Sequence, residues 1–508
     1  MHREERRERR DWFIAYAVCA IGALLPLLVT YRLPMADLPQ HAAQATILRF
    51  FDAACYDFGA LFEINWTTPY LLGTLIAALL GSVKLTTFLA IAALPLALRH
   101  AARYAGIDPW LALLGFPVAF GFAFYWGFLT FMLTVPLVIV AAVEVHRSTE
   151  PGAPRRVARL LLLSFAIVVC HALGFAALLL ITLPIVCVRA LRDRRALPAL
   201  FAVMAPLPLF LLWAASESAS APRARVPLFW DIDASRLRGV LDHLLAAGGD
   251  VEALLASMAL VVIVFVSGAR FSKDWTRWLG FVAALAWTLL APRVAMGQTF
   301  LFERFTVLVF ATLFLALEPS TKPILRPPVL RMLVVVFVLL WSVVLVARFH
   351  RFHADARGFD ELVDRMRTNQ RVLLLNLDAR SDAVSGMPFL HFSGYYQERK
   401  GGVIGWSFSS NFPSVVRYRR GITEGVPNYI TYDPRHFDME KHGAYRYFIV
   451  RSPADIGPLL FGDDADRVVL RGRSGLWWLY ERPDFPLREE CTPLTPDGKH
   501  QPLMRLGR

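Results

Sequence analysis

Residues 12–30 decide the fold class of this chain, and their sequence is WFIAYAVCAIGALLPLLVT. The run contains no charged side chain and matches the ~20 residues that a helix needs to cross a bilayer. It follows the arginine-rich segment MHREERRERR, residues 1–10. Because basic segments beside a membrane helix stay in the cytoplasm, the pair predicts a signal anchor with a cytoplasmic N-terminus. A cleaved signal peptide is the alternative, since AQA at residues 43–45 imitates a cleavage site, but the apolar run exceeds the usual ~7 to 15 residues.

The composition extends this conclusion to the whole chain. Of 508 residues, 56% are hydrophobic and 19% are charged, and the mean hydropathy is +0.46. These values exclude a soluble globular protein and a disordered one, and five cysteines exclude a disulfide scaffold. The net charge of +13 does not indicate nucleic-acid binding, because the arginines lie between apolar blocks and not along one face. A multi-pass α-helical membrane protein remains.

Apolar blocks recur as far as residue 347. The stretch 69–104 is ambiguous, because it is too long for one straight helix and short for two. If 69–81 is re-entrant or interfacial and 85–104 spans the membrane, the arginine-rich loops all fall in the cytoplasm, as the positive-inside rule requires. This solution gives eleven spans: 12–30, 85–104, 109–126, 127–146, 158–170, 172–190, 197–215, 251–269, 276–291, 304–318 and 329–347.

Eleven spans predict two domains. Residues 1–347 form a transmembrane domain with a first outer loop at 31–68, and residues 348–508 form a domain on the outer side. The bias toward arginine and alanine is typical of a bacterial genome rich in G and C, so the expected location is the bacterial inner membrane, with the second domain in the periplasm.

The region after residue 347 shows the patterns of a soluble domain. A helix is expected near 359–367, and VLLLNL at 372–377 is typical of a buried strand. A further strand at 445–450 and a hairpin at 468–480 complete a small α/β domain.

The cysteines fall into two groups under this topology. Cys55 and Cys491 lie outside, whereas Cys19, Cys170 and Cys187 lie in spans. An oxidising periplasm permits a disulfide between the outer two. A pair of buried free thiols is the alternative, and we favour it from the sequence.

The first outer loop opens with MADLPQH, residues 35–41. Asp37 and His41 are four residues apart and therefore lie on one face if a helix includes both. Asp37 followed by Pro39 and Gln40 also matches a helix N-cap with a capping-box glutamine, in which the carboxylate only satisfies helix amides. The spacing alone does not choose between chemistry and capping.

These features together resemble the GT-C superfamily of membrane glycosyltransferases, which includes the protein O-mannosyltransferases, the lipid A aminoarabinose transferases and many bacterial relatives. The resemblance covers the anchored first helix, the large first loop, the number of spans and the outer α/β domain. Asp37 matches the acidic residue of the family's first loop, and His41 matches a histidine that many bacterial relatives carry. Leu38 stands where the O-mannosyltransferases have a second acidic residue, which weakens the case for a metal and for a protein acceptor.

The resemblance implies an inverting glycosyltransferase without a cofactor. The donor would be a polyprenyl-phosphate sugar, and the acceptor a lipid, glycan or protein of the cell envelope. Asp37 would be the general base that deprotonates an acceptor hydroxyl, with His41 beside it. Direct displacement at the anomeric carbon inverts its configuration and needs no covalent intermediate.

A leaving phosphate would need cations on the outer side. The segment APRVAMGQTFLFERF, residues 291–305, supplies the candidates for donor binding, which are Arg293, Gln298, Glu303 and Arg304. Charged groups at the end of a span are costly unless they are paired or hydrated, which favours a function. Snorkelling or an internal salt bridge is the alternative. Arg223 and Arg225 are further candidate cations in the loop 216–250.

Two histidines are candidates for a cavity wall. His171 lies at an outer turn between two spans, where a structural role is the alternative. His391 opens HFSGYY, a segment that ends near Gly401 and Gly402 and reads as a loose surface stretch rich in aromatic rings. Such rings suit sugar faces, but we favour packing because aromatic residues make up 13% of the chain.

Other function classes find less support. The sequence has no P-loop, Rossmann fingerprint, CxxC or HExxH motif. A transporter or lipid flippase is the main alternative, yet it would be expected to show internal repeats and charges at mid-membrane depth. A non-catalytic envelope scaffold is the third possibility.

Overall fold

The computed structural model describes residues 2–150, 152–220, 228–295, 298–320, 324–411, 413–419, 421 and 426–494. The chain is mostly helical, with a mixed β-sheet in its C-terminal region. It divides into two compact units. The helical unit consists of Met1–Leu28 and Thr87–Val346, and the sheet unit consists of Val29–Thr86 and Ala347–Arg508.

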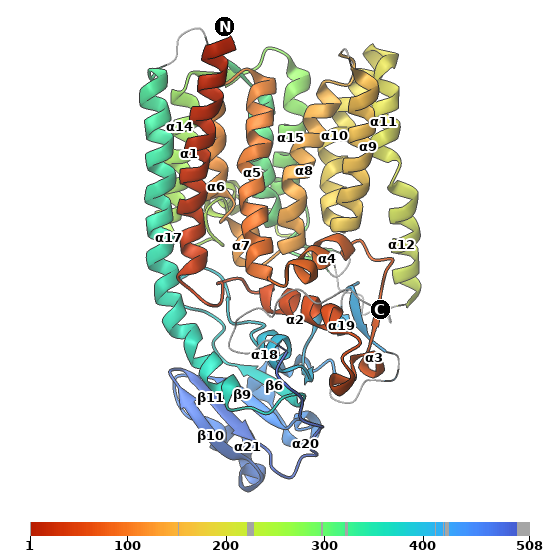
Figure 1. The fold of residues 1–508 in the computed structure, drawn as a ribbon, viewed down its shortest axis with the longest axis vertical. Helices are drawn as coiled ribbons and strands as arrows, with labels where there is room; N and C mark the ends of the chain where they lie inside the picture. The colour runs from red at the N-terminus through yellow and green to blue at the C-terminus, as the bar shows by residue number, and fades with distance from the viewer. Residues whose placement is uncertain are drawn as a thin grey trace. The chain divides into compact units, whose positions relative to one another are not determined.

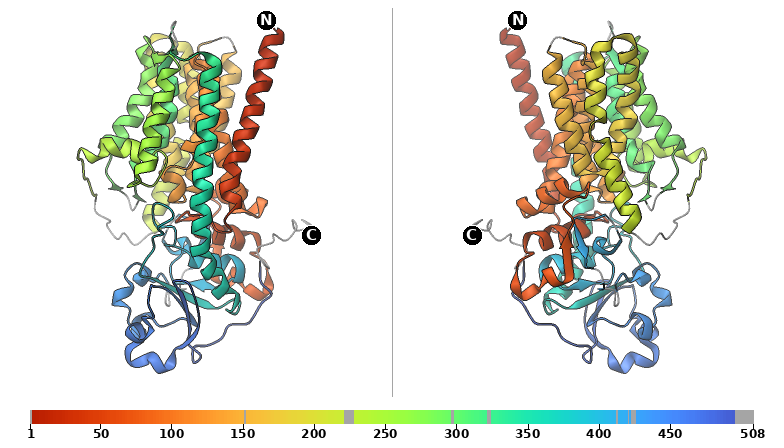
Figure 2. Two further views of the ribbon diagram at one scale, coloured as in Figure 1. Left: turned by 90° about the vertical axis from the view of Figure 1, so that its left-hand side faces the viewer. Right: turned by 90° about the vertical axis from the view of Figure 1, so that its right-hand side faces the viewer.

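Long helices make up most of the helical unit and run side by side (Figure 1; Figure 2). They are α1 (His2–Leu28), α5 (Val83–Ala105), α8 (Leu129–His146), α9 (Ala153–Cys170), α10 (Ala172–Arg192), α11 (Leu197–Met204), α12 (Leu207–Ser220), α14 (Val251–Val266), α15 (Leu279–Leu290), α16 (Thr306–Ala316) and α17 (Pro327–Asp364). Helices α5 and α17 each contribute residues to both units.

Six segments of the described chain are long and apolar enough to cross a membrane, as expected for a multi-pass membrane protein. They are Glu5–Leu28, Val83–Ala105, Leu129–His146, Ala172–Arg192, Arg194–Ser216 and Pro327–Asp364. The remaining predicted spans coincide with shorter or more charged helices, so the count of eleven stays a prediction.

The ambiguous stretch 69–104 forms two helices. Helix α4 (Leu71–Leu80) ends at Gly81, whose φ of +61° is a left-handed conformation that glycine adopts readily, and α5 begins at Val83. At 1.5 Å per residue, α4 is about 15 Å long, which is too short for the ~30 Å core of a bilayer. Its separation from α5 is therefore confirmed.

Two predicted segments differ from the structure. Residues 109–126 form the short helices η2 (Pro109–Leu114), α6 (Gly115–Val118) and α7 (Phe122–Tyr125) in place of one regular helix. A Cβ at Gly121 would lie 2.5 Å from the Leu244 carbonyl oxygen, so the break at this glycine allows a close backbone approach. The span 329–347 and the helix near 359–367 are one continuous helix, α17, because no proline separates them.

The sheet unit contains a five-stranded sheet of order β10-β11-β9-β6-β7 (Figure 1). Strand β6 pairs in parallel with β7 and β9, whereas β11 pairs in an antiparallel manner with β9 and β10. The strands are β6 (Arg371–Asn376), β7 (Val403–Ile404), β9 (Tyr447–Arg451), β10 (Val469–Ser474) and β11 (Trp477–Glu481). The predicted strands and hairpin are confirmed. The apolar residues of β6, β9 and β11 form the buried centre of this sheet, whereas β10 at its edge is largely exposed.

The segment that follows the first helix belongs to the same unit. It contains α2 (Leu38–Arg49), η1 (Ala54–Tyr56), α3 (Phe58–Leu61) and β1 (Phe62–Ile64). Strand β1 pairs with β8 (Val416–Tyr418), and α2 packs against α18 (Ser393–Lys400). A Cβ at Gly394 would lie 2.5 Å from the Pro39 carbonyl oxygen, so this glycine allows the two helices to approach closely.

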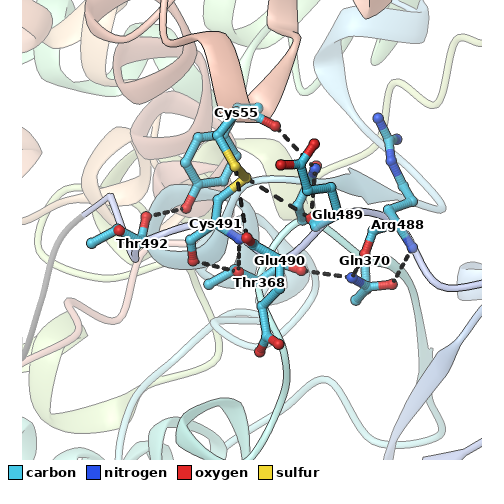
Figure 3. The surroundings of a disulfide bond; sticks show 10 residues. Cys55, Thr368, Gln370, Arg488, Glu489, Glu490, Cys491 and Thr492 are labelled. Carbon is cyan, nitrogen blue, oxygen red and sulfur yellow. Dashed lines mark hydrogen bonds between the residues drawn. A yellow bond between two sulfur atoms is a disulfide. The ribbon is translucent and has the colours of Figure 1, made fainter.

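A disulfide bond joins Cys55 to Cys491 (Figure 3). The segment around Cys491 is also tied to residues 368–370, because Thr368 Oγ1 donates to the Cys491 carbonyl and accepts from its N–H. Gln370 exchanges two hydrogen bonds with the backbone of Arg488 in the same way. The expectation of two free thiols was therefore wrong.

Candidate functional site

Asp37 precedes helix α2 but does not cap it through its side chain. Its backbone is helical, with φ −90° and ψ −9°, and its carboxylate makes no capping hydrogen bond. The reason is local, since Asp37 has helical backbone angles instead of the extended ones of an N-cap, and the Gln40 N–H donates to the Asp37 carbonyl oxygen at 3.0 Å. The side chain of Gln40 instead donates to the Trp406 carbonyl at 3.3 Å and accepts from the Phe408 N–H at 3.0 Å. The capping-box interpretation was therefore wrong.

Asp37 and His41 share the first turn of α2. The His41 N–H donates to the Asp37 carbonyl oxygen at 3.2 Å, so the predicted spacing of one helical turn is confirmed. The imidazole of His41 meets the ring of Phe408 edge to face, with ring centroids 5.6 Å apart.

The carboxylate of Asp37 lies beside a buried histidine. His391 Nε2 is 3.4 Å from Asp37 Oδ1, and the two side chains are 5% and 16% exposed. The imidazole stacks on the Trp406 indole, with centroids 4.3 Å apart and planes inclined by 10°. Burial lowers the pKa of His391 to about 3, which keeps the ring neutral at physiological pH. A neutral ring beside the carboxylate leaves the negative charge of Asp37 uncancelled.

Further rings complete the surroundings of this pair. The Tyr432 ring lies edge to face with both Trp406, at 5.4 Å, and His391, at 5.9 Å. Phe408 contacts Trp406 at 5.7 Å. Burial, followed by the charge of Asp37, raises the pKa of the Tyr432 hydroxyl. The Asp37 cluster is the set Asp37, His41, His391, Trp406, Phe408 and Tyr432.

Glutamines on α2 hold the aromatic segment in place. Gln44 Nε2 donates to Ser409 Oγ at 2.7 Å and to the Val416 carbonyl at 3.0 Å. Gln44 Oε1 accepts from the Val416 N–H at 2.8 Å. Together with Gln40, these bonds fix the chain around Trp406 and Phe408 against the helix that follows Asp37.

The segment that follows His391 is not the loose surface stretch expected from its glycines. Residues 393–400 form helix α18, and the rings of Phe392, Tyr395 and Tyr396 are buried. Gly401 and Gly402 have positive φ values and lead from the helix into β7. The preference for packing over sugar binding is therefore confirmed for these three rings.

The predicted donor-binding residues lie in the helical unit, where some of them pair internally. Arg293 Nη1 is 2.9 Å from Asp231 Oδ2, and Arg293 Nε is 3.1 Å from Glu303 Oε1. Arg236 also pairs with Asp231, at 2.7 Å. The internal salt bridge that we considered as an alternative is therefore present at Arg293. A role in donor binding stays a prediction.

Gln298 and Arg304 lie on either side of a tight turn. Gln298 lies in β4 (Gln298–Thr299), which pairs with β3 (Val294–Ala295). Arg304 is buried, with its guanidinium carbon 3.7 Å from the centroid of the Phe128 ring, and its Nη2 donates to the Thr299 carbonyl at 2.8 Å.

His171 has a structural role in the helical unit. It is the N-cap of α10, where its Nδ1 accepts from the N–H groups of Leu173 and Gly174 at 3.0 and 3.3 Å. Its ring also meets Phe131 edge to face. Arg223 and Arg225 lie outside the described residues.

Sequence reasoning missed Trp406, Phe408 and Tyr432 as neighbours of Asp37. They lie far from Asp37 in the sequence and follow no helical or strand period that would single them out. The bonds of Gln40 and Gln44 bring Trp406 and Phe408 to the helix that follows Asp37, and the bond from the Asn428 N–H to the Gly405 carbonyl brings the turn of Tyr432 beside them.

The arrangement contains the groups that a reaction needs when a carboxylate acts as the base. A partly exposed carboxylate that lies beside a neutral imidazole and aromatic rings can accept a proton from a bound hydroxyl. Among the residues that the structure describes, no three His, Cys, Asp or Glu side chains gather so as to hold a metal ion. In comparisons with known proteins, the sequence matches no protein-family model and no curated protein at a significant level.

Proposed function

We propose that this chain is an inverting membrane glycosyltransferase of the GT-C type. It would move a sugar from a polyprenyl-phosphate donor to an envelope acceptor at the outer face of a bacterial inner membrane. The observation that supports this proposal most is the state of Asp37, whose carboxylate forms no helix cap and lies 3.4 Å from the buried His391. A carboxylate held in this way is suited to act as a general base.

In this mechanism Asp37 removes the proton of an acceptor hydroxyl as its oxygen attacks the anomeric carbon of the donor. The bond from that carbon to the phosphate oxygen breaks, and polyprenyl phosphate leaves. His391 packs beside Asp37 as a neutral ring, and His41 contacts the acceptor or the donor phosphate. Arg293, Gln298, Glu303 and Arg304 remain the proposed donor-binding residues, and Arg304 is the cation expected to act on the leaving phosphate.

The membrane arrangement belongs to the same proposal. Eleven spans, with a cytoplasmic N-terminus and a periplasmic sheet unit, present Asp37 on the side where lipid-linked sugars are used. Six segments that meet the length and hydropathy of a membrane helix are consistent with this topology. A flippase or scaffold provides no reason to hold a carboxylate against a buried imidazole.

The direct test is Asp37→Asn in a deletion strain. Asn keeps the size of the side chain and cannot accept the proton, so transfer should fall by about 10²- to 10⁴-fold. The readout is the profile of lipid-linked glycans at matched expression. Asp52→Asn is the control, because Asp52 is an exposed carboxylate of the same segment. His41→Ala should have a milder effect, and Arg304→Ala should raise the donor KM.

Folding must be checked in the same samples. Because no capping bond is lost, the Asp37→Asn protein should keep its thermal midpoint. If the Asp37→Asn protein restores native glycan output at native expression, Asp37 is not the base and the proposed function is wrong.

A further inference from the structure

Tyr432 is the most exposed ring of the Asp37 cluster, in which His41 and Phe408 are half-buried. Tyr432 lies at the end of η6 (Tyr429–Tyr432) and is 43% exposed, whereas Trp406 and His391 are buried. The Tyr432 hydroxyl makes no hydrogen bond with any residue that the structure describes. A partly exposed ring with an available hydroxyl therefore lies beside the proposed base.

Two buried rings and a hydrogen-bonded turn hold the Tyr432 ring in place. Its contacts with Trp406 and His391 are edge to face, at interplanar angles of 80° and 89°. The turn that carries it is fixed by Asn428, whose N–H donates to the Gly405 carbonyl at 2.6 Å and whose side chain accepts from the Ile430 N–H. This bond joins the segment that carries Tyr432 to the residue that precedes Trp406.

The chemistry of this surface fits a sugar ring. A pyranose presents a face of C–H groups, which packs on an aromatic face, and a rim of hydroxyls, which bond to carboxylate, imidazole and phenol groups. A quaternary ammonium ion needs several ring faces that converge on it. Here His391 covers one face of Trp406, and His41 and Phe408 are half-buried. Tyr432 is therefore the ring that lies open beside the carboxylate, which favours the sugar.

We propose that Tyr432 is the platform on which a sugar ring of the acceptor lies, with one of its hydroxyls directed at Asp37. The acceptor is therefore a carbohydrate, and the reaction forms a bond between two sugars. The inference rests on the proposed function and specifies its acceptor. The proton of the acceptor hydroxyl passes to Asp37, the acceptor oxygen bonds to the anomeric carbon, and the phosphate oxygen takes the electrons of the broken bond.

The test uses the full-length protein purified in detergent. The donor is the polyprenyl lipid extract of cells grown on radiolabelled glucose. Two acceptor fractions come from the envelope of the deletion strain: glycans with their lipid carriers, and protein freed of lipid. Label should enter the glycan fraction, and linkage analysis should find a new sugar-to-sugar bond. Label on protein side chains or directly on a lipid would overturn the proposal.

Variants of Tyr432 test the platform itself. Tyr432→Ala should raise the KM for the glycan fraction by about 3- to 10-fold and leave the donor KM unchanged, since ring contacts of this kind contribute modestly. Tyr432→Phe keeps the ring and should recover most of the loss. Trp66→Ala is the control, because Trp66 is an exposed ring of the same unit, in the segment after β1. An unchanged acceptor KM in Tyr432→Ala would refute the platform.

Binding without turnover separates this inference from the proposed function. In saturation-transfer NMR, the Asp37→Asn protein should still bind glycans released from the same fraction, whereas Tyr432→Ala should bind them more weakly. If Asp37→Asn retains full transfer, the assignment of the base fails, and the Tyr432 measurements still decide on the platform. If Asp37→Asn is inactive and Tyr432→Ala binds and reacts normally, only the platform fails.

Discussion

Arg32 lies between two carboxylates in the interior of the sheet unit. Its Nη2 is 3.0 Å from Asp360 Oδ1 on α17, and its Nη1 is 2.5 Å from Glu398 Oε2 on α18. The guanidinium carbon also lies 3.8 Å from the centroid of the Tyr395 ring. One side chain just after α1 therefore binds two helices from the other end of the sequence.

The first prediction follows from this contact. Arg32→Ala should lower the free energy of unfolding by about 3 to 5 kcal/mol, because it deprives the largely buried Glu398 of this cation and leaves Asp360 with the more distant Arg399. Arg32→Lys should lose less, since it keeps the charge. Thermal midpoints of the purified proteins measure the effect, with Arg10→Ala as an exposed control. A midpoint for Arg32→Ala equal to that of the control would contradict the role of this pair.

The second prediction concerns His391 and acid. Its folded-state pKa is lowered from 6.5 to about 3, so below about pH 6.5 the unfolded chain binds a proton that the folded chain does not. Stability is therefore complete above pH 6.5 and declines as the pH falls toward 3. At pH 5 the loss amounts to about 2 kcal/mol.

A comparison of variants isolates this contribution. His391→Gln keeps a hydrogen-bond donor but does not titrate, so its thermal midpoint should fall less than that of the wild type between pH 7 and pH 5. His436→Gln changes an exposed histidine and should follow the wild type. Equal acid sensitivity in all three proteins would show that His391 does not remain neutral on folding.

The third prediction concerns the disulfide. Under denaturing, non-reducing conditions only Cys19, Cys170 and Cys187 should react with an alkylating agent, and all five cysteines should react after reduction. Cys55→Ser and Cys491→Ser should each lower stability by about 2 to 4 kcal/mol, and the double variant should lose no more than either one. Five reactive thiols without a reductant would exclude the bond.

The fourth prediction concerns topology. A reporter that is active only in the periplasm should be active when fused after Arg367, beyond the end of α17, and inactive when fused within residues 189–195. Fusion after α17 leaves this continuous helix intact. Periplasmic activity of the 189–195 fusion would reject the proposed orientation.

The sequence predicted the elements of this fold better than their contacts. The apolar runs that became α8 and α10 and the run 372–377 of β6 have local periods and lengths that physical chemistry interprets directly. The continuity of α17 was missed because hydropathy falls after residue 347 while the backbone stays helical. A fall in hydropathy along a segment therefore does not by itself mark the end of its helix.

The candidate site shows the same limit. Asp37 and His41 were recognisable because they are one turn apart, and the capping interpretation failed because the backbone of Asp37 is itself helical. His391 was identified only as a possible wall residue. Its position 3.4 Å from Asp37 depends on the packing of α18 on α2, which no local pattern encodes.

The bond between Cys55 and Cys491 has a consequence for biogenesis. Its two cysteines are 436 positions apart, so a ribosome delivers the second only after every membrane helix from α5 to α17 has been made. The segment that carries Asp37 therefore lacks its disulfide partner through most of synthesis. Strands β1 and β8, which pair with each other, are subject to the same delay. Completion of this part of the protein therefore follows the synthesis of the helical unit.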